Sequence, residues 1–370
     1  MCGVPLVPRA PGGPFTRVAF AAAHVVSDPV AARSPWDGRP ALDWQATLQF
    51  RESLWDQGFG LAEAMDTAQR GLGLDWATAL ELIQRTMAAA RAHPLRPRVA
   101  CGVGTDQLQG LATADAIFAA YAHQAEAVET AGGRIIVMAS RAFGAIGARP
   151  DDYRAVYRRP IDGAAAPVIL HWLGEMFDPH LAGYWGTRDV DAASALVLGL
   201  IAENPGQVDG IKISLLNQCH EEDFRARLPA GVRLYTGDDF HYPSLIAGDG
   251  AHFSHALLGI FAAIAPAAAQ ALQALALGDL ATYHALLAPT VPLSREIFRP
   301  PTRFYKAGIA CLAWLNGHQR HFIMPAGLQS SRDITHYAAV FRLADQAALL
   351  ADPDLAAARM TSLLALHGIP

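Results

Sequence analysis

The segment Val208-Asp-Gly-Ile-Lys-Ile-Ser-Leu215 gives the clearest indication of the fold in this 370-residue chain. Successive side chains of a strand point to opposite faces, so Lys212 and Ser214 share one face and the two isoleucines share the other. Branched apolar residues on one face are typical of a strand covered by helices. We therefore predict a strand whose apolar face packs on helices and whose other face carries Lys212 into the interior of a barrel.

Similar apolar runs of strand length recur along the chain and alternate with amphipathic segments. We predict strands at residues 16–23, 59–64, 98–103, 134–139, 167–172, 208–215, 232–236 and 250–254. Helices are predicted between them at 43–57, 76–92, 113–130, 151–157, 190–203 and 221–226, several after a capping Asp, Thr or Asn. Eight strand and helix units in about 250 residues fit an α/β (β/α)8 TIM barrel. The first strand also lacks the Gly-rich turn of a dinucleotide-binding fold.

The predicted organisation has three parts. Residues 1–14 form an N-terminal tail, residues 15–266 form the barrel, and residues 267–370 form a C-terminal helical extension with helices at 267–287, 304–316 and 333–350. The apolar stretch Ala256–Leu277 is long enough to suggest a membrane span, but Pro266 and two glutamines interrupt it, so we expect a buried helix or helix pair. Pro and Gly near the N-terminus argue against a secretory signal.

The overall composition narrows the class of protein. Hydrophobic residues make up 52% of the chain and charged residues 17%, which is enough apolar surface for a large core. A formal net charge of −5 gives no basic surface for nucleic acid. The four cysteines, at positions 2, 101, 219 and 311, form no C-x-x-C pair, so we predict a reducing, cytoplasmic location.

Lysine is scarce in this chain. Of 29 basic residues only Lys212 and Lys306 are lysines. A lysine that faces an enclosed apolar site loses hydration of its charged form, its pKa falls, and the neutral amine can attack a ketone to form a Schiff base. The alternative is a buried lysine paired with an inward carboxylate such as Asp66, Asp238 or Asp239. Lys306 lies at or near a predicted helix start, where we expect a side chain that is solvated or in a surface ion pair and has no catalytic role.

Several motifs of the chain match a known superfamily. The runs Val208–Ser214, Leu234-Tyr-Thr-Gly-Asp-Asp239 and Gly248–Ser254 resemble the sixth to eighth strands of the dihydrodipicolinate synthase and N-acetylneuraminate lyase superfamily of class I aldolases. Ala100–Gly104 resembles its third strand, and Pro167–Leu170 resembles its fifth. Gly58-Phe-Gly60 and Met65–Gln69 stand where its Gly-Thr-Thr-Gly-Glu loop belongs. The resemblance covers roughly residues 15–330, and the long form of the chain is similar to a divergent subfamily of unknown function.

This resemblance implies a TIM barrel in which Lys212 forms a Schiff base. It implies a carbon–carbon or carbon–oxygen lyase, an aldolase or dehydratase, that acts on a 2-keto acid or keto-sugar derivative without a diffusible cofactor. It also implies a small-molecule carbonyl substrate and assembly as a homodimer or homotetramer.

The chain departs from that superfamily at three places. The carboxylate-binding loop keeps only the hydroxyl of Thr67 and gains the negative charge of Asp66. Ala139-Ser-Arg-Ala-Phe143 replaces the segment that carries the proton-relay tyrosine. Leu173-Gly-Glu-Met176 replaces an arginine-bearing segment. We therefore do not expect dihydrodipicolinate synthesis itself.

Other residues at strand ends are candidates for the missing roles. His171 is the candidate acid–base group, because imidazole titrates near neutral pH, and Arg141 is the candidate for holding a carboxylate. The remaining candidates for substrate binding are Asp66, Thr67, Gln69, Ser214, Asp238 and Asp239. Each has a structural alternative: His171 as a core histidine, Arg141 as a partner of Asp66 or Glu175, and the others as loop caps.

Two other classes of function remain open from the sequence. A metal-dependent isomerase or class II aldolase acting on sugars would gather a divalent metal from His24, Glu63, Asp66, His171, Asp239 and His241, although no spacing specifies such a site. A barrel without catalysis, acting as a sensor or scaffold, would agree with the missing relay tyrosine.

Overall fold

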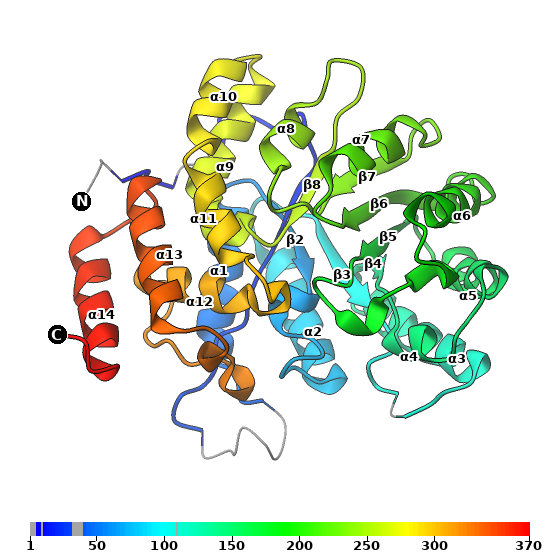
Figure 1. Cartoon of the computed structure of the whole chain (residues 1–370), viewed down its shortest axis with the longest axis horizontal. Helices are drawn as coiled ribbons and strands as arrows, with labels where there is room; N and C mark the ends of the chain where they lie inside the picture. The colour runs from blue at the N-terminus through cyan, green and yellow to red at the C-terminus, as the bar shows by residue number, and fades with distance from the viewer. Residues whose placement is uncertain (1–4, 9, 32–39, 109) are drawn as a thin grey trace.

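A closed barrel of eight parallel strands forms the centre of the molecule (Figure 1). The computed structural model describes residues 5–8, 10–31, 40–108 and 110–370. Each strand pairs with the next and the eighth pairs with the first. The strands are β1 (Ala19–Ala22), β2 (Gly60–Glu63), β3 (Val99–Val103), β4 (Arg134–Val137), β5 (Val168–Leu173), β6 (Val208–Ser214), β7 (Arg233–Thr236) and β8 (His255–Leu258). The predicted TIM barrel is confirmed.

Helices surround the barrel and connect its strands. They are α1 (Trp44–Trp55), α2 (Trp76–Ala92), α3 (Ala114–Thr130), α4 (Arg141–Ala145), α5 (Pro150–Gly163), α6 (Val190–Ala202), α7 (Gln218–Ala226), α8 (Tyr242–Ala247) and α9 (Phe261–Ala276). Side chains of Asp43, Asp75, Thr113 and Asp189 accept hydrogen bonds from N–H groups of the first turns of α1, α2, α3 and α6. These caps satisfy donors that have no partner within the helix, and they explain where the four helices begin.

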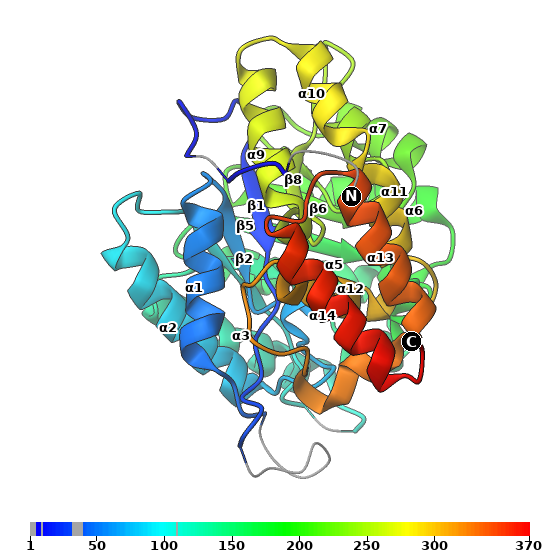
Figure 2. The ribbon, with the colours of Figure 1, turned by 90° about the vertical axis from the view of Figure 1, so that its left-hand side faces the viewer.

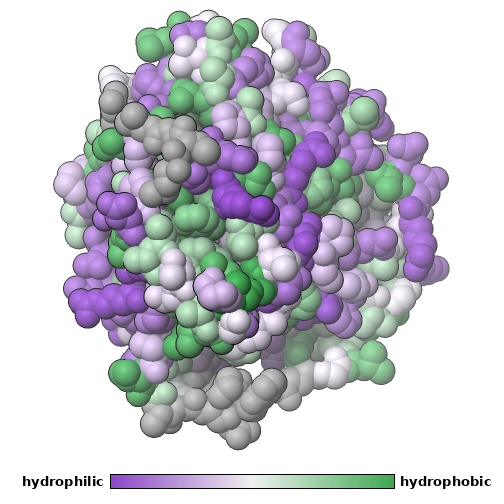
Figure 3. Space-filling model, turned by 60° about the vertical axis from the view of Figure 1, so that its left-hand side comes forward, coloured by the Kyte–Doolittle hydropathy of each residue, from purple (hydrophilic) through white to green (hydrophobic). Residues whose placement is uncertain are grey.

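The C-terminal part of the chain is helical and covers one side of the barrel. Its helices are α10 (Leu280–Leu287), α11 (Thr290–Ile297), α12 (Lys306–Leu315), α13 (Ile334–Gln346) and α14 (Pro353–Leu366). Helix α12 contacts α9, while α13 and α14 pack outside α12 (Figures 1 and 2). On the face that these outer helices cover, hydrophilic and hydrophobic side chains are interspersed (Figure 3). No helix in the described part of the chain is long and apolar enough to cross a membrane.

The eighth strand was predicted at the wrong place. The strand is 255–258 rather than 250–254, because the Asp249 carboxylate accepts hydrogen bonds from the N–H groups of Ala251 and His252 and holds that segment in a turn.

The boundary predicted at residue 266 is also wrong, since it falls inside α9. Pro266 is accommodated within that helix by a local departure of Ile264 from helical dihedral angles. The segment predicted as one helix at 267–287 is two, separated by Gly278, whose φ is +79°. The predicted tail at residues 1–14 lies partly outside the described residues.

Two apolar cores hold the barrel. The larger lies between the strands and the helices and includes Ile211 and Ile213 of β6. The smaller fills the interior of the barrel with the side chains Phe20, Ala22, Ala62, Met65, Ala100, Ile136, Ile169, Tyr235 and Leu257. Polar residues follow this interior core at the carboxyl ends of the strands, which is where active sites of (β/α)8 barrels lie.

Candidate active site

Lys212 points into the barrel, as the alternation along its strand predicts. Its Cα lies in register with His171 of β5 and Tyr235 of β7, and Tyr235 belongs to the interior core. The Lys212 side chain is buried, with 6% of its surface exposed. Among the described residues no carboxylate oxygen lies within 4 Å of its Nζ, and no hydrogen-bond partner holds it. The amine is therefore buried but not locked in an ion pair.

The surroundings of Lys212 lower the pKa of its amine. Burial is the main cause, because it disfavours the ammonium form, and the nearby carboxyl groups of Asp66 and Asp239 partly oppose it. A lowered pKa increases the fraction of neutral, nucleophilic amine at a given pH.

Gly237 gives the lysine side chain its place. A Cβ at this position would lie 2.7 Å from Cε of Lys212 and 2.7 Å from the carbonyl oxygen of Ile213. Both distances are shorter than carbon makes with these atoms, so the end of β7 can approach β6 only where a side chain is absent.

A cavity of about 480 Å³ opens at the carboxyl ends of β2 to β5. Its polar lining consists of Asp66, Arg70, Thr105, Asp106, Arg141, His171, Asp178, His180 and Lys306. Lys212 lies beside this cavity rather than in its wall, next to His171 in the barrel. The volume is in the range of small-molecule sites.

Asp66 is held by hydrogen bonds and by the charges of both lysines. The hydroxyl of Tyr305 donates to Oδ2 of Asp66 at 2.6 Å and lies 2.6 Å from Oγ1 of Thr67. Burial alone would raise the pKa of Asp66, but the charges of Lys306 and Lys212, in that order, outweigh it, and the pKa is about 2. The carboxylate is thus ionised at neutral pH.

Lys306 is buried in the cavity wall, so its predicted surface position is wrong. It begins α12, only 2% of its surface is exposed, and its Nζ donates to the carbonyl of Arg303 at 3.1 Å. Its ammonium lies 4.8 Å from the centroid of the Tyr305 ring. Burial lowers the pKa of Lys306 and Asp66 raises it, giving a pKa of about 8. The packing of α12 on the barrel brings this residue to the site.

His171 and Asp239 flank Lys212 in forms that can exchange protons. Nε2 of His171 lies 3.3 Å from Oγ of Ser214, and burial together with the Lys212 charge holds the pKa of His171 well below its usual range. Burial raises the pKa of Asp239 to about 8, although its Oδ1 accepts a hydrogen bond from the N–H of Ile260 at 2.9 Å. At neutral pH the imidazole is uncharged and the carboxyl is mostly protonated.

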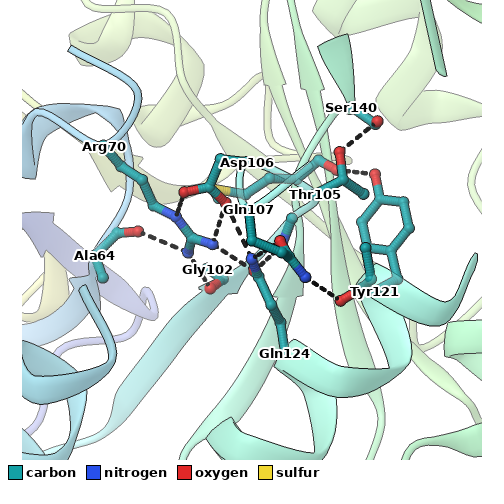
Figure 4. A network of polar contacts seen from close by, with 12 residues as sticks. Ala64, Arg70, Gly102, Thr105, Asp106, Gln107, Tyr121, Gln124 and Ser140 are labelled. Atoms are coloured by element: carbon teal, nitrogen blue, oxygen red, sulfur yellow. Dashed lines mark hydrogen bonds and ion pairs between the residues drawn. The ribbon is translucent and has the colours of Figure 1, made fainter. Parts of the chain in front are cut away.

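A network of polar contacts fixes the wall of the cavity near β3 (Figure 4). Arg70 donates to Oδ2 and Oδ1 of Asp106 at 3.0 and 2.6 Å and to the carbonyl of Gly102 at 2.6 Å. Gln124 also accepts from Arg70 and donates to Asp106. The guanidinium is therefore fully used within the protein, and this wall is rigid.

Arg141 is the remaining guanidinium of the lining. It forms an ion pair with Asp178, which also pairs with His180, and 46% of the Arg141 side chain is exposed. The ion pair of Arg141 is therefore with Asp178 and not with Asp66 or Glu175, its predicted partners.

Two predicted substrate-binding residues do not reach the cavity. The amide of Gln69 donates to the carbonyls of Leu72 and Pro325, at 3.1 and 3.0 Å, and joins the β2 loop to the C-terminal part. Asp238 caps the turn after β7 and pairs with His241. The contacts of both side chains are with neighbouring groups of the protein.

Three of the six candidate ligands of the alternative metal site have partners elsewhere in the fold. Glu63 is on the outer side of the barrel, where Arg51 donates to both of its oxygens at 2.6 and 2.8 Å. Nε2 of His24 bonds to the side chain of Gln319, and His241 pairs with its neighbour Asp238. Within residues 5–8, 10–31, 40–108 and 110–370, no group of three or more His, Cys, Asp or Glu side chains is arranged to hold a metal ion.

Sequence reasoning missed Lys306, Tyr305 and the Arg70 pair as parts of the site. Lysine scarcity was the one signal for Lys306, and no signal marked the contact of Tyr305 with Asp66. Of the predicted residues, the structure gathers Asp66, Thr67, His171, Lys212, Ser214 and Asp239, with Arg141 at the rim.

The fold and this arrangement define a class: a (β/α)8 barrel with a buried lysine on β6, free of any carboxylate within 4 Å among the described residues, beside a polar cavity. Within that class, the chain belongs to the family described as "Protein of unknown function (DUF993)", matched over residues 3–369. A comparison with curated proteins found no match.

Solved structures of dihydrodipicolinate synthase proteins share the fold, as the resemblance implies. YagE of the dihydrodipicolinic acid synthase family from E. coli K12, in complex with pyruvate, is 17% identical, with a TM-score of 0.67 over 90% of this chain and 99% of its own. Dihydrodipicolinate synthase from Aquifex aeolicus is 13% identical, with a TM-score of 0.66 over 90% and 99%. The enzyme from Oceanobacillus iheyensis is 13% identical, with a TM-score of 0.65 over 89% and 96%. At these identities the likeness concerns the fold.

Proposed function

We propose that this protein is a Schiff-base-forming lyase, an aldolase or dehydratase, that acts on a 2-keto acid or keto-sugar derivative through Lys212. The observation that carries this proposal is a buried amine inside the barrel, beside a cavity and without a carboxylate within 4 Å among the described residues. The same fold holds pyruvate in YagE, which agrees with a small carbonyl compound as the ligand.

The chemistry begins with attack of the neutral Lys212 amine on the carbonyl carbon. A C–N bond forms, the C=O π electrons move to oxygen, and a proton passes from nitrogen to oxygen to give a carbinolamine. The C–O bond then breaks, water leaves after taking up a further proton, and the nitrogen lone pair completes a protonated imine. This cation accepts electrons from a neighbouring C–C or C–H bond, which leads to aldol cleavage or to dehydration.

His171 and Asp239 supply the protons in this proposal. The mostly protonated carboxyl of Asp239 is the acid that assists departure of water, and the uncharged imidazole of His171 is the base at the substrate carbon. Asp66 stays ionised and stabilises the positive imine, since its charge interacts with Lys212.

We place the protein in the cytoplasm as a homodimer or homotetramer that binds small molecules. The proposed reducing location rests on the sequence, in which the four cysteines form no C-x-x-C pair. Light scattering tests the assembly, and a monomer at all concentrations would contradict that part.

Reductive trapping tests the function. The protein is mixed with 2-keto acids and keto sugars, sodium borohydride is added, and the intact mass is measured. We expect one adduct per chain for at least one compound and none in the Lys212→Arg variant. A complete absence of adducts over a broad set of carbonyl compounds would favour a barrel without catalysis, and trapping that persists in Lys212→Arg would refute the role of this lysine.

A further inference from the structure

We infer that Lys306 binds an oxyanion group of the substrate, a carboxylate or phosphate, while Lys212 reacts with its carbonyl carbon. This inference rests on the proposed function and identifies the substrate as an anionic carbonyl compound. It also assigns to the C-terminal helices a direct part in the site, because Lys306 begins α12.

The pairing of the cavity's basic residues singles out Lys306. Arg70 is paired with Asp106, and both Arg141 and His180 are paired with Asp178. Among the described residues, Lys306 is the lining cation that has no carboxylate within 4 Å. An ammonium group carries three N–H donors, and within the described part of the chain one of them is used, by the carbonyl of Arg303. A buried cation with two free donors facing a cavity is a binding site for an anion.

The position of Lys306 is fixed from two sides. Its ammonium lies over the ring of Tyr305, and the hydroxyl of that tyrosine is tied to Asp66 and Thr67. The charge is therefore held at one place before a ligand arrives, and little side-chain entropy is lost on binding. The negative charge of Asp66 opposes an anion near the β2 loop, and the free donors of Lys306 have to outweigh that repulsion.

Binding of unreactive anions tests this inference separately from the proposed chemistry. Lactate and glycerol 3-phosphate carry a carboxylate and a phosphate but have no ketone, so neither forms an imine. Calorimetry measures their affinity for the full chain, for Lys306→Met, which preserves length and removes charge, and for Lys306→Arg, which keeps the charge. Glycerol is the uncharged control, and circular dichroism confirms that each variant is folded.

We expect at least one of the two anions to bind, with affinity reduced at least about tenfold in Lys306→Met and partly restored in Lys306→Arg. The anion that responds decides between carboxylate and phosphate. No binding of either anion, or equal binding by wild type and Lys306→Met, would overturn the inference. Trapping on Lys212 is measured in parallel: anion binding through Lys306 without any trapped adduct would refute the proposed function and leave the anion site standing.

Discussion

Removal of the Asp66 charge should shift the titration of both lysines. The change is Asp66→Asn, which keeps the size of the side chain and the possibility of a hydrogen bond from Tyr305. The carboxylate raises the pKa of Lys306 and of Lys212. Its loss should therefore lower both values and increase the neutral fraction of each amine.

The pKa of Lys306 gives the size of the expected shift. With a pKa of about 8, roughly nine-tenths of this amine is protonated at pH 7. An opposite charge close to a titrating group shifts its pKa by about 1 to 3 units. In Asp66→Asn the pKa of Lys306 should fall to about 7 or below, so that half or more of the amine is neutral at pH 7. One unit corresponds to about 1.36 kcal/mol.

The composition of the chain makes the assay direct. Only two lysines are present, so 13C labelling of lysine at Cε gives two side-chain signals, and Lys306→Met assigns them. We expect both signals to titrate below the usual value of about 10.4 in the wild type and lower still in Asp66→Asn. If either signal titrates near 10.4 in the wild type, or if Asp66→Asn moves neither, the description of the site as one coupled charge cluster is wrong.

The fold and the site give three further expectations. Gly237→Ala should displace the Lys212 side chain and lower reductive trapping by about a hundredfold without unfolding the protein. The control Gly163→Ala, where a Cβ meets nothing within 4 Å, should trap like wild type. Equal trapping by both variants would show that the absence of a side chain at Gly237 does not position Lys212. Arg51→Met should lower the free energy of unfolding in urea by about 3–5 kcal/mol, because it leaves the buried Glu63 carboxylate without its ion-pair partner. The control Arg85→Met breaks an exposed ion pair and should lower the free energy of unfolding by less than about 1 kcal/mol. Similar losses in the two variants would show that burial does not strengthen the Arg51 pair. Glu221 is buried and has a pKa of about 8, whereas its pKa in the unfolded chain is about 4.3, so between these pH values the folded state keeps a proton that the unfolded state releases, and the free energy of unfolding falls as the pH rises. In Glu221→Gln the fall in unfolding free energy from about pH 5 to pH 8 should be smaller by at most about 4 kcal/mol. An unchanged fall would show that the Glu221 carboxyl is ionised in the folded protein.

The sequence was sufficient for the barrel and for the direction of Lys212, because both depend on local periodicity. Alternation along residues 208–215 places Lys212 opposite Ile211 and Ile213 whatever the tertiary context, and strand β6 has that orientation. The prediction placed strand β8 too early in the chain, because residues 250–254 have a strand-like composition but follow Asp249, whose side chain accepts hydrogen bonds from the backbone and holds them in a turn.

The part of the site that the C-terminal helices contribute, Tyr305 and Lys306, could not be predicted from local periodicity. Tyr305 and Asp66 are 239 positions apart in the chain, and their hydrogen bond depends on how α12 packs against the barrel. Local patterns of the sequence contain no information on that packing, so they predicted that Lys306 lies exposed at the start of a helix. The same limit applies to Asp178, whose pairing with Arg141 joins the segment after β5 to the start of α4, and periodicity does not place these two segments relative to each other.

Mapping the reduced adduct onto the two lysines identifies the amine that forms the Schiff base. Protein trapped with borohydride in the presence of pyruvate or another reactive carbonyl compound is digested, and the peptides that contain Lys212 and Lys306 are compared by tandem mass spectrometry. Lys306 lines the cavity and serves as an internal control for nonspecific modification. We expect the mass increase on Lys212 alone; an adduct on Lys306, or equal modification of both lysines, would contradict the assignment of the reactive amine to β6.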